Sequence, residues 1–178
     1  AKASQNVDGE AAGHRVWGVA LFRQGDYKAS RFQLEKALTL ARKGGGHEVE
    51  VDSLHNLGIV FTLQSDYAGA IAYYEQAMHL AREIGDRQRE GGVLNGLGIL
   101  SSSQGDHVRA KSCFEQALHV AREIGDRRSE GLRLCNLGLL SVHMGDYAEI
   151  RAPQEQALRI FREIGDRYRE STVLNSLG

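Results

Sequence analysis

The sequence is poor in the features that would assign it quickly to a class of protein. Of its 178 residues one is proline and two are cysteine, and the net charge is −1. With no excess of lysine and arginine to coat phosphates, nucleic acid is not an expected partner. No apolar run approaches the roughly 20 residues that a membrane-spanning helix needs, so a membrane is not expected either.

What the sequence does contain is a motif that returns every forty residues. Four related blocks, GDYKASRFQLEKAL, SDYAGAIAYYEQAM, GDHVRAKSCFEQAL and GDYAEIRAPQEQAL, start at Gly25, Ser65, Gly105 and Gly145. Between them, REIGDRQRE, REIGDRRSE and REIGDRYRE start at Arg82, Arg122 and Arg162, with a degenerate copy, RKGGGHEVE, at Arg42. A fixed period of this length is typical of stacked supersecondary units and not of one globular core.

The ends of the chain and its cysteines bear on where the protein works. The sequence begins at Ala1 without a methionine and stops at Gly178 within a repeat, so we expect a fragment of a larger protein. Cys113 and Cys135 fall at different positions of different repeats, which excludes a ladder of disulfides. Reduced thiols predict a cytoplasmic protein, although the missing signal peptide is weak evidence in a fragment.

Each period contains two segments whose apolar residues recur at helical spacing. In 107–124 these residues include Val108, Phe114, Ala117 and Ala121. Gly-Asp pairs separate the segments, because glycine can take the left-handed conformation that ends a helix and aspartate can cap the next one. Such short connections predict antiparallel neighbours. We expect helix pairs at 10–43, 48–84, 88–124 and 128–164, the start of a fifth first helix at 168–178, and a frayed segment at 1–9.

Pro153 breaks the pattern in the fourth pair. It lies about seven residues into the expected second helix, where proline removes a hydrogen bond and clashes with the preceding turn. Ile150 and Gln154 also replace the alanine and the aromatic residue found in other repeats. We therefore predict a kink or a late start of this helix, and looser packing of the fourth pair.

The helix pairs resemble tetratricopeptide repeats. Their first-helix pattern is met by Leu54, Leu57-Gly58 and Phe61, and their second-helix pattern by Ala70, Tyr74 and Ala77. The forty-residue period is similar to that of kinesin light chains, Pins-type adaptors and bacterial regulatory members of the family. The resemblance implies an all-α fold, a right-handed superhelical α-solenoid of antiparallel helix pairs, forming a single array over residues 10–178.

In this family the first helices line a concave groove, and the helical wheel assigns one face of each to it. The expected groove residues are Arg15, Val19, Arg23, His55, Asn56, Ile59, Asn95, Ile99, Ser102, Asn136, Leu139, His143 and Asn175. Val19, Ile59, Ile99 and Leu139 form an aliphatic stripe among them. The stripe either packs against adjacent first helices or forms an exposed floor for hydrophobic anchors of a ligand.

Asparagine within a helix is a second feature of this set, because it is a poor helix former. Asn56, Asn95, Asn136 and Asn175 carry amides that both donate and accept hydrogen bonds, which suits a peptide backbone. In the kinesin-light-chain and Pins-type relatives, asparagine at such places contacts cargo peptides, so the resemblance implies the same role here. The alternative is a ladder of asparagines bonded between adjacent helices.

No catalytic pattern emerges. Gly44-Gly45-Gly46 lacks the Lys-Ser or Lys-Thr of a phosphate loop and aligns with the inter-repeat turns. His79 and His119 are equivalent, but Thr39 and Arg159 flank them in the series, so no metal site is expected. We expect no enzyme activity, no cofactor and no metal.

The leading hypothesis is a noncatalytic scaffold that binds a protein partner, as a peptide or helix, in its groove, within a larger regulatory or signalling protein. The alternative is a self-association or intramolecular regulatory module of a multidomain bacterial regulator. Leu174 and Leu177 at the end of the chain would favour an end-to-end homodimer in this second case.

Overall fold

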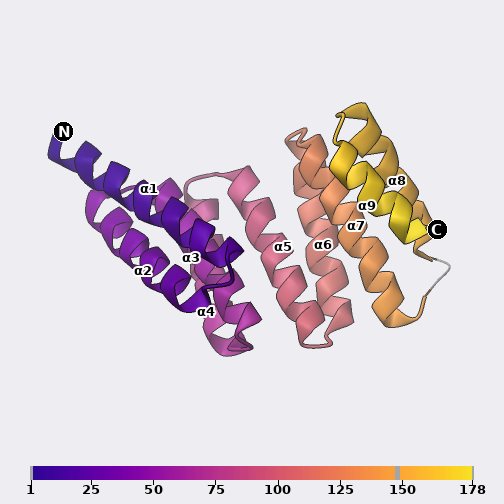
Figure 1. Cartoon of the computed structure of the whole chain (residues 1–178), viewed down its shortest axis with the longest axis horizontal. Coiled ribbons are helices and arrows are strands. Elements are labelled where there is room, and N and C mark those ends of the chain that lie inside the picture. Colours follow the sequence, from indigo (N-terminus) through magenta and orange to yellow (C-terminus); the bar gives the residue numbers. More distant parts are fainter. Residues whose placement is uncertain (1, 147–148, 178) are drawn as a thin grey trace. The chain divides into compact units, whose positions relative to one another are not determined.

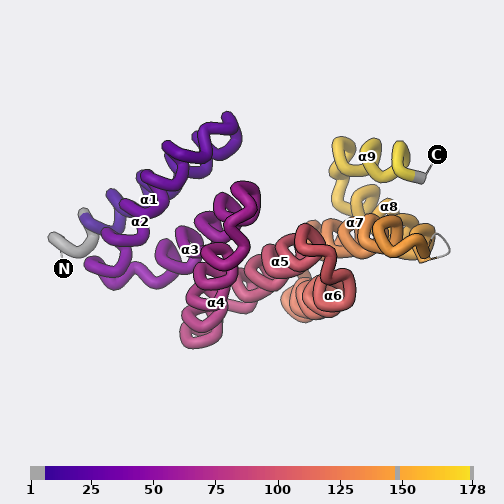
Figure 2. Tube along the Cα trace, turned by 90° about the horizontal axis from the view of Figure 1, so that it is seen from below, coloured from indigo at the N-terminus to yellow at the C-terminus, as the bar shows by residue number. Residues whose placement is uncertain are grey.

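A computed structural model describes the backbone of residues 2–146 and 149–177, and side chains from residue 7 to residue 176 outside that gap. Within these residues the chain is helical, with short turns and no strand (Figure 1). The helices are α1 Lys2–Arg23, α2 Tyr27–Gly44, α3 His47–Leu63, α4 Tyr67–Glu83, α5 Arg87–Ser103, α6 His107–Glu123, α7 Arg127–Met144, α8 Arg151–Glu163 and α9 Arg167–Leu177. Consecutive helices such as α1 and α2, or α3 and α4, lie side by side as hairpins (Figure 2).

Most helix limits fall within a few residues of the prediction, and the largest difference is at the start of the chain. The sequence predicts a frayed segment over residues 1–9, whereas α1 begins at Lys2. Ala1 lies outside the described residues. Val7 and Asp8 lie against the last turn of α2, where a Cβ built on Gly44 would come 3.3 Å from Val7 Cγ1. Packing against α2 supports a segment that has no apolar periodicity of its own.

The turns between helices have the predicted chemistry. Gly25, Gly105 and Gly145 have φ values of 82°, 78° and 73°, which is the left-handed conformation that closes a helix. The aspartate that follows caps the next helix, as where Asp106 accepts a 3.0 Å hydrogen bond from the Arg109 amide. Ser65 occupies the equivalent position with φ 61° and is the exception. This conformation costs free energy in a residue that has a Cβ, whereas glycine adopts it freely.

Close packing within a pair depends on a glycine of the first helix that faces a large residue of the second. A Cβ on Gly58 would lie 2.6 Å from Tyr74 Cε1, and a Cβ on Gly98 would lie 2.5 Å from Phe114 Cε1. Tyr74 and Phe114 are buried. The small residues therefore let the helices approach and the rings fill the space, as the sequence pattern predicts.

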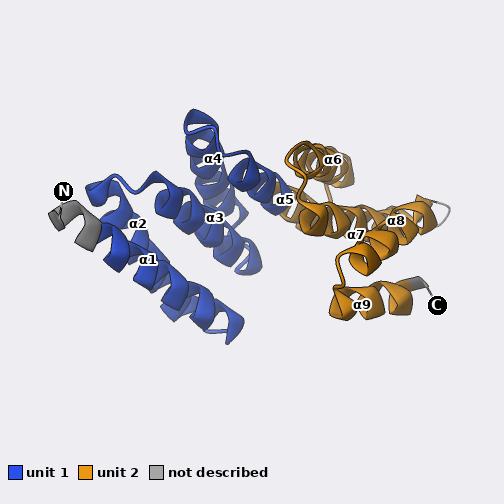
Figure 3. Cartoon of the chain, turned by 90° about the horizontal axis from the view of Figure 1, so that it is seen from above, with its two compact units in different colours: residues 1–96 blue, residues 97–178 orange. Residues whose placement is uncertain are grey.

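The contact pattern divides the chain into two compact units, residues 1–96 and 97–178 (Figure 3). In the first unit, Leu34, Leu54, Leu57 and Tyr74 are among the fully buried side chains. In the second unit, α6, α7, α8 and α9 contribute to a cluster that contains Leu118, Leu134, Ala157, Leu158, Ile160, Phe161 and Val173. Each unit therefore has its own apolar interior.

A repeated ion pair ties each second helix to the first helix that follows it. An arginine near the end of one helix donates through Nε to a glutamate in the first turn of the next. The pairs are Arg42–Glu50 at 2.7 Å, Arg82–Glu90 at 2.9 Å, Arg122–Glu130 at 2.9 Å and Arg162–Glu170 at 2.8 Å. Burial raises the pKa of the Glu90 carboxyl, but hydrogen bonds from Arg82 and Arg87 outweigh burial and hold that pKa below its ordinary value.

The fourth pair departs from the others as its proline predicts. Helix α8 begins only at Arg151 and has 13 residues, against 17 or 18 for α2, α4 and α6, so the predicted late start is confirmed. Pro153 lies in its first turn, where its missing N–H costs nothing. Gln154 takes the buried aromatic position, and its Oε1 has no hydrogen-bond partner among the described residues. The first part of the predicted helix, residues 147–148, lies outside the described residues.

Candidate functional site

The predicted groove residues all lie on the first helices of their pairs: α1, α3, α5, α7 and α9. The structure brings some of them together in two places, one within each unit. In the first unit, Arg15 contacts Asp52, and His55 lines a pocket beside Asp52. Ile99, Ser102, Asn136, Leu139 and His143 line a pocket in the second.

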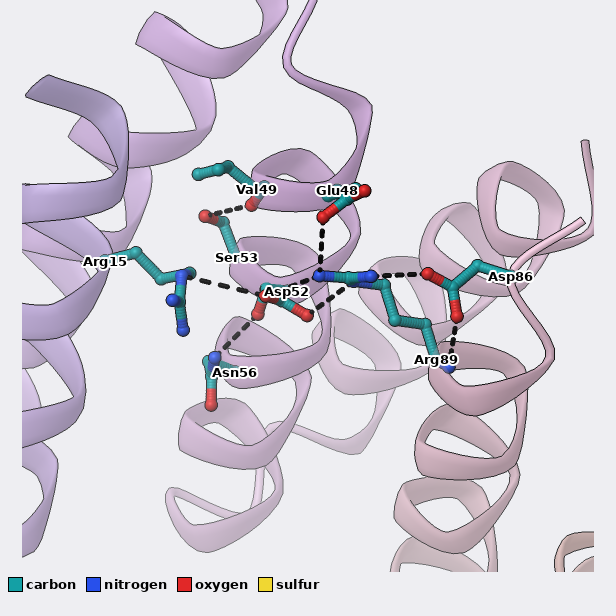
Figure 4. Close-up of polar contacts among 8 residues, drawn as sticks. All are labelled: Arg15, Glu48, Val49, Asp52, Ser53, Asn56, Asp86 and Arg89. Carbon is teal, nitrogen blue, oxygen red and sulfur yellow. Dashed lines mark hydrogen bonds and ion pairs between the residues drawn. The ribbon is translucent and has the colours of Figure 1, made fainter. Parts of the chain in front are cut away.

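In the first unit, Asp52 of α3 lies between arginines of two other first helices (Figure 4). Arg15 of α1 places its Nε 3.7 Å from one Asp52 oxygen, and Arg89 of α5 donates from Nε to the other at 3.0 Å. Arg89 also contacts Glu48 at 3.2 Å and Asp86. This charged cluster connects α1, α3 and α5.

A pocket of about 310 Å³ opens beside the charged cluster. Its walls are Val51, Asp52, His55, Gln88, Arg89 and Gly92. The pocket is polar, and Asp52 and Arg89 already satisfy each other across it. The resulting surface offers hydrogen-bonding groups and an ion pair, with Val51 as an apolar part of its lining.

The pocket of the second unit is apolar. It has a volume of about 130 Å³ and is lined by Ile99, Ser102, Ser103, Phe114, Asn136, Leu139, Leu140 and His143, and we call it the α5–α7 pocket. Phe114 and Leu140 are buried and form its base. The His143 ring stacks on His107 with centroids 6.2 Å apart, which fixes one edge.

The four residues of the aliphatic stripe differ in how exposed their side chains are. Ile99 and Leu139 are 45% and 55% exposed and lie in the α5–α7 pocket. Val19 and Ile59, in the first unit, are less exposed than these two side chains and line neither pocket described above. The stripe is therefore an exposed apolar surface in the second unit, where packing between helices leaves these two side chains uncovered.

The asparagines do not share one environment. By the forty-residue period Asn56 and Asn136 occupy one position, whereas Asn95 and Asn175 occupy the preceding position, shared with His55. Asn56 donates a 2.6 Å hydrogen bond to the Asp52 carbonyl of its own helix, so it takes part in no ladder between helices through that donor. Asn136 lies in the α5–α7 pocket, and Asn175 is exposed near the end of α9.

Two contributors to these sites were not predicted. Arg89 lies in an inter-repeat segment, where the arginine of REIGDRQRE distinguishes this copy from REIGDRRSE. Phe114 was noted as one of the apolar residues at helical spacing in 107–124, and it also lines the pocket of the second unit. Arg23, by contrast, is exposed at the end of α1 and joins neither site.

Among the described residues, no group of three or more histidine, cysteine or acidic side chains is arranged to hold a metal ion. Gly45 ends α2 in the left-handed conformation, with φ 80°, which agrees with the prediction of a turn in the triple-glycine segment. Across residues 2–146 and 149–177, no helix has both the length and the apolar character that crossing a bilayer requires.

Several solved structures are similar to this chain in fold. A Rap protein complexed with Competence and Sporulation Factor matches 95% of this chain with a TM-score of 0.86 and 14% identity. BtubC (BKLC) from P. vanneervenii matches 87% with a TM-score of 0.74 and 23% identity. A putative kinesin light chain with TPR-like repeats from Podosopora anserina matches 92% with a TM-score of 0.65 and 14% identity, over 91% of its own length. The chain spans 64% of BtubC and 46% of the Rap protein.

No curated protein matches the sequence. The family model of the tetratricopeptide repeat matches residues 10–83 and 89–163, which is most of the chain. This agrees with the glycine-to-ring packing and the capped turns described above. The fold is that of a protein-interaction scaffold, and the chain belongs to the tetratricopeptide-repeat family.

Proposed function

We propose that this protein captures a partner protein as a peptide or helix, by seating an apolar side chain of the partner in the α5–α7 pocket. The observation that carries the proposal is the exposure of Ile99 and Leu139 over a buried base. Exposed aliphatic side chains around a hollow gain free energy when a ligand covers them.

The size of the pocket argues for a side chain and against a metabolite. Sites for small molecules usually enclose about 300 to 1,000 Å³. The α5–α7 pocket has about 130 Å³, which leaves room for one anchoring side chain while the rest of a ligand lies across the surface. A partner held by such anchors is a peptide segment.

The rim of the pocket supplies the polar contacts that a peptide backbone needs. Asn136, Ser102 and His143 can each donate or accept a hydrogen bond. A Rap protein that is similar to this chain in fold was solved with Competence and Sporulation Factor bound. We propose the same general use of the fold here, in the cytoplasm and as part of a larger regulatory or signalling protein.

The test is affinity capture from a lysate of the source organism with two matched variants. Leu139→Asp places a charge in the pocket, and Val108→Asp places the same charge on α6, where Val108 is 79% exposed and lines no pocket described above. The proposal expects one protein to be retained by the native chain and by Val108→Asp, and to be lost by Leu139→Asp. Retention by all three would refute the role of the pocket.

A second candidate, self-association, has its own observation. On α9, Tyr168 and Leu174 are 78% and 43% exposed, and on α1, Val16 and Trp17 are 58% and 54% exposed. Apolar surfaces at both termini of a repeat array can join copies head to tail.

Light scattering at several concentrations separates the two candidates. Self-association predicts a mass that rises with concentration in the native chain and stays at one chain in Leu174→Glu. A mass that stays at one chain throughout in the native protein would exclude it.

A further inference from the structure

The forty-residue register places Arg89 and Arg169 at the same point of their repeats, eighty residues apart. Each lies in the first turn of a first helix, three residues after a capping aspartate, Asp86 or Asp166. Each arginine contacts that aspartate through its side chain. The two sites differ in everything beyond this shared contact.

Arg89 is satisfied within the fold. Its Nε donates to Asp52 at 3.0 Å, and its other nitrogens reach Glu48 at 3.2 Å and Asp86. Arg169 has no counterpart to the first two of these contacts. Its Nε is buried, lies 3.3 Å from Asp166 Oδ2, and makes no hydrogen bond with the described residues.

The cause is a change of residue on the neighbouring first helix. Where α3 carries Glu48 and Asp52, the same register of α7 carries Arg128 and Leu132. An acid has become a base, and the acceptor of the arginine Nε has become an aliphatic side chain. Arg128 itself lies 3.6 Å from Asp166 through Nε, so two guanidinium groups share one carboxylate.

The charge balance of the two sites is therefore opposite. In the first unit, Arg15 and Arg89 face the three carboxylates of Glu48, Asp52 and Asp86. Among the described residues of the second unit, the one carboxylate that Arg128 and Arg169 contact is that of Asp166. Other nearby acids are taken up elsewhere, since Glu170 pairs with Arg162 and Arg167, and Glu130 with Arg122 and Arg127.

We propose that Arg128 and Arg169 bind a carboxylate of the partner, the side chain of an aspartate or glutamate in the captured peptide. This inference rests on the proposed function, because it extends the same bound peptide along α7. A guanidinium group holds a carboxylate through charge-assisted and often bidentate hydrogen bonds. Leu132 occupies the position of Asp52, and the Arg169 Nε is buried. An incoming carboxylate therefore contacts the remaining nitrogens of the Arg169 side chain, which is 31% exposed.

The spacing of the two contacts defines the peptide. Leu132 and Leu139 are seven residues apart on α7, which is about 10 Å along the axis. An extended peptide covers that distance in about three residues. The preferred ligand therefore carries an acidic residue about three positions from its apolar anchor.

The experiment uses random twelve-residue peptides displayed on phage and selected on the whole protein. The strongest binder is then made with a fluorescent label, in its native form and with each acidic residue changed to glutamine. Binding is measured by fluorescence anisotropy against the native protein and against Arg169→Met, Leu132→Asp, Leu139→Asp and Arg109→Met. Arg109 is an exposed arginine of α6 outside both contacts, so its variant controls for loss of charge alone.

We expect selected peptides to share an acidic residue near an aliphatic or aromatic one. Arg169→Met and Leu132→Asp should each weaken the acidic peptide about tenfold and leave the glutamine peptide unchanged. Leu132→Asp is the sharper test, because it restores the internal carboxylate that α3 supplies to Arg89. Circular dichroism shows whether each variant is folded. If Leu132→Asp is not folded, the affinity of Arg169→Met for the two peptides tests the inference by itself.

Four results would count against the inference. Selected peptides without acidic residues would overturn it, and so would equal affinity of the acidic and glutamine peptides for the native protein. In either case the proposed function stands if Leu139→Asp still abolishes binding. If Arg109→Met loses as much affinity for the acidic peptide as Arg169→Met does, the effect is due to net charge alone, and the inference is also overturned. Failure to select any peptide would overturn both proposals together.

Discussion

The ring of Tyr74 lies directly on the backbone of Gly58, so close that a methyl group at position 58 would come 2.6 Å from Tyr74 Cε1. Gly96 of α5 approaches the same ring equally closely. Tyr74 is 1% exposed, so it has nowhere to move. One aromatic side chain thus sets the distance between three helices of the first unit.

Gly58→Ala is expected to destabilise the protein by about 1 to 3 kcal/mol, because the overpacked interior outweighs the better helix propensity of alanine. Gly92→Ala is the matched control, since a Cβ there would be in ordinary contact with the His55 ring, 3.6 Å from Cε1 and 3.9 Å from Nδ1. That change should be neutral or stabilise by up to about 1 kcal/mol. Urea unfolding followed by circular dichroism measures both, and equal effects of the two changes would contradict the packing argument.

Tyr74 also predicts how stability depends on pH. Burial raises the pKa of its hydroxyl to about 12, from an ordinary value near 10, despite a hydrogen bond with Thr62 that lowers it. The unfolded chain then loses this proton at lower pH than the folded chain, so stability falls as pH rises from about 10 to 12. The loss should approach 2 to 3 kcal/mol.

Tyr74→Phe isolates this contribution from other groups that titrate at high pH. The difference in unfolding free energy between Tyr74→Phe and the native chain should shift in favour of the variant by that amount above pH 10. A difference that stays constant from pH 8 to pH 12 would show that the hydroxyl titrates as it does in water.

Ser65→Gly is expected to stabilise the first unit by about 0.5 to 1 kcal/mol. Ser65 holds a left-handed conformation, with φ 61°, that costs a residue with a Cβ about 1 to 2 kcal/mol. The greater freedom of glycine in the unfolded chain offsets part of the gain. Gly105→Ser, the reverse change in the next repeat, should have the opposite sign, and urea unfolding of both variants checks the pair.

Gln154→Leu is expected to stabilise the fourth helix pair by about 1 to 2 kcal/mol. The change removes a buried amide whose Oε1 lacks a hydrogen-bond partner among the described residues. Leucine fills the same position in the first repeat, where Leu34 is fully buried. Hydrogen exchange of residues 151–163 should slow in the variant, and faster exchange there would mean that Gln154 makes a contact essential to α8.

Much of the fold was predictable because its rules are local. Gly25 and Asp26 mark a turn through their own backbone and side-chain preferences, and Pro153 limits α8 through its own ring. The helical conformation of residues 2–9 was not predictable in this way, because it depends on Val7 and Asp8 meeting the end of α2. Tertiary packing there outweighs the weak local pattern.

The candidate site likewise has a part that was predictable from the sequence and a part that was not. Ile99, Ser102, Asn136, Leu139 and His143 were predictable as a group from helical geometry and the repeat. The difference in exposure between Ile59 and Ile99 was not predictable, because exposure depends on how neighbouring helices pack. Likewise, the sequence reveals Arg89 and Arg169 as equivalent positions, but only the contacts reveal that Asp52 satisfies the first.

The most direct test of the central claim, that the α5–α7 pocket holds the partner, is photocrosslinking from inside it. A photoreactive phenylalanine analogue replaces Leu139 in one protein and Val108 in another, and each is irradiated in a lysate of the source organism. The account predicts a crosslinked partner peptide from position 139 and none from position 108. Crosslinking at position 108 alone, or of the same proteins at both positions, would contradict it.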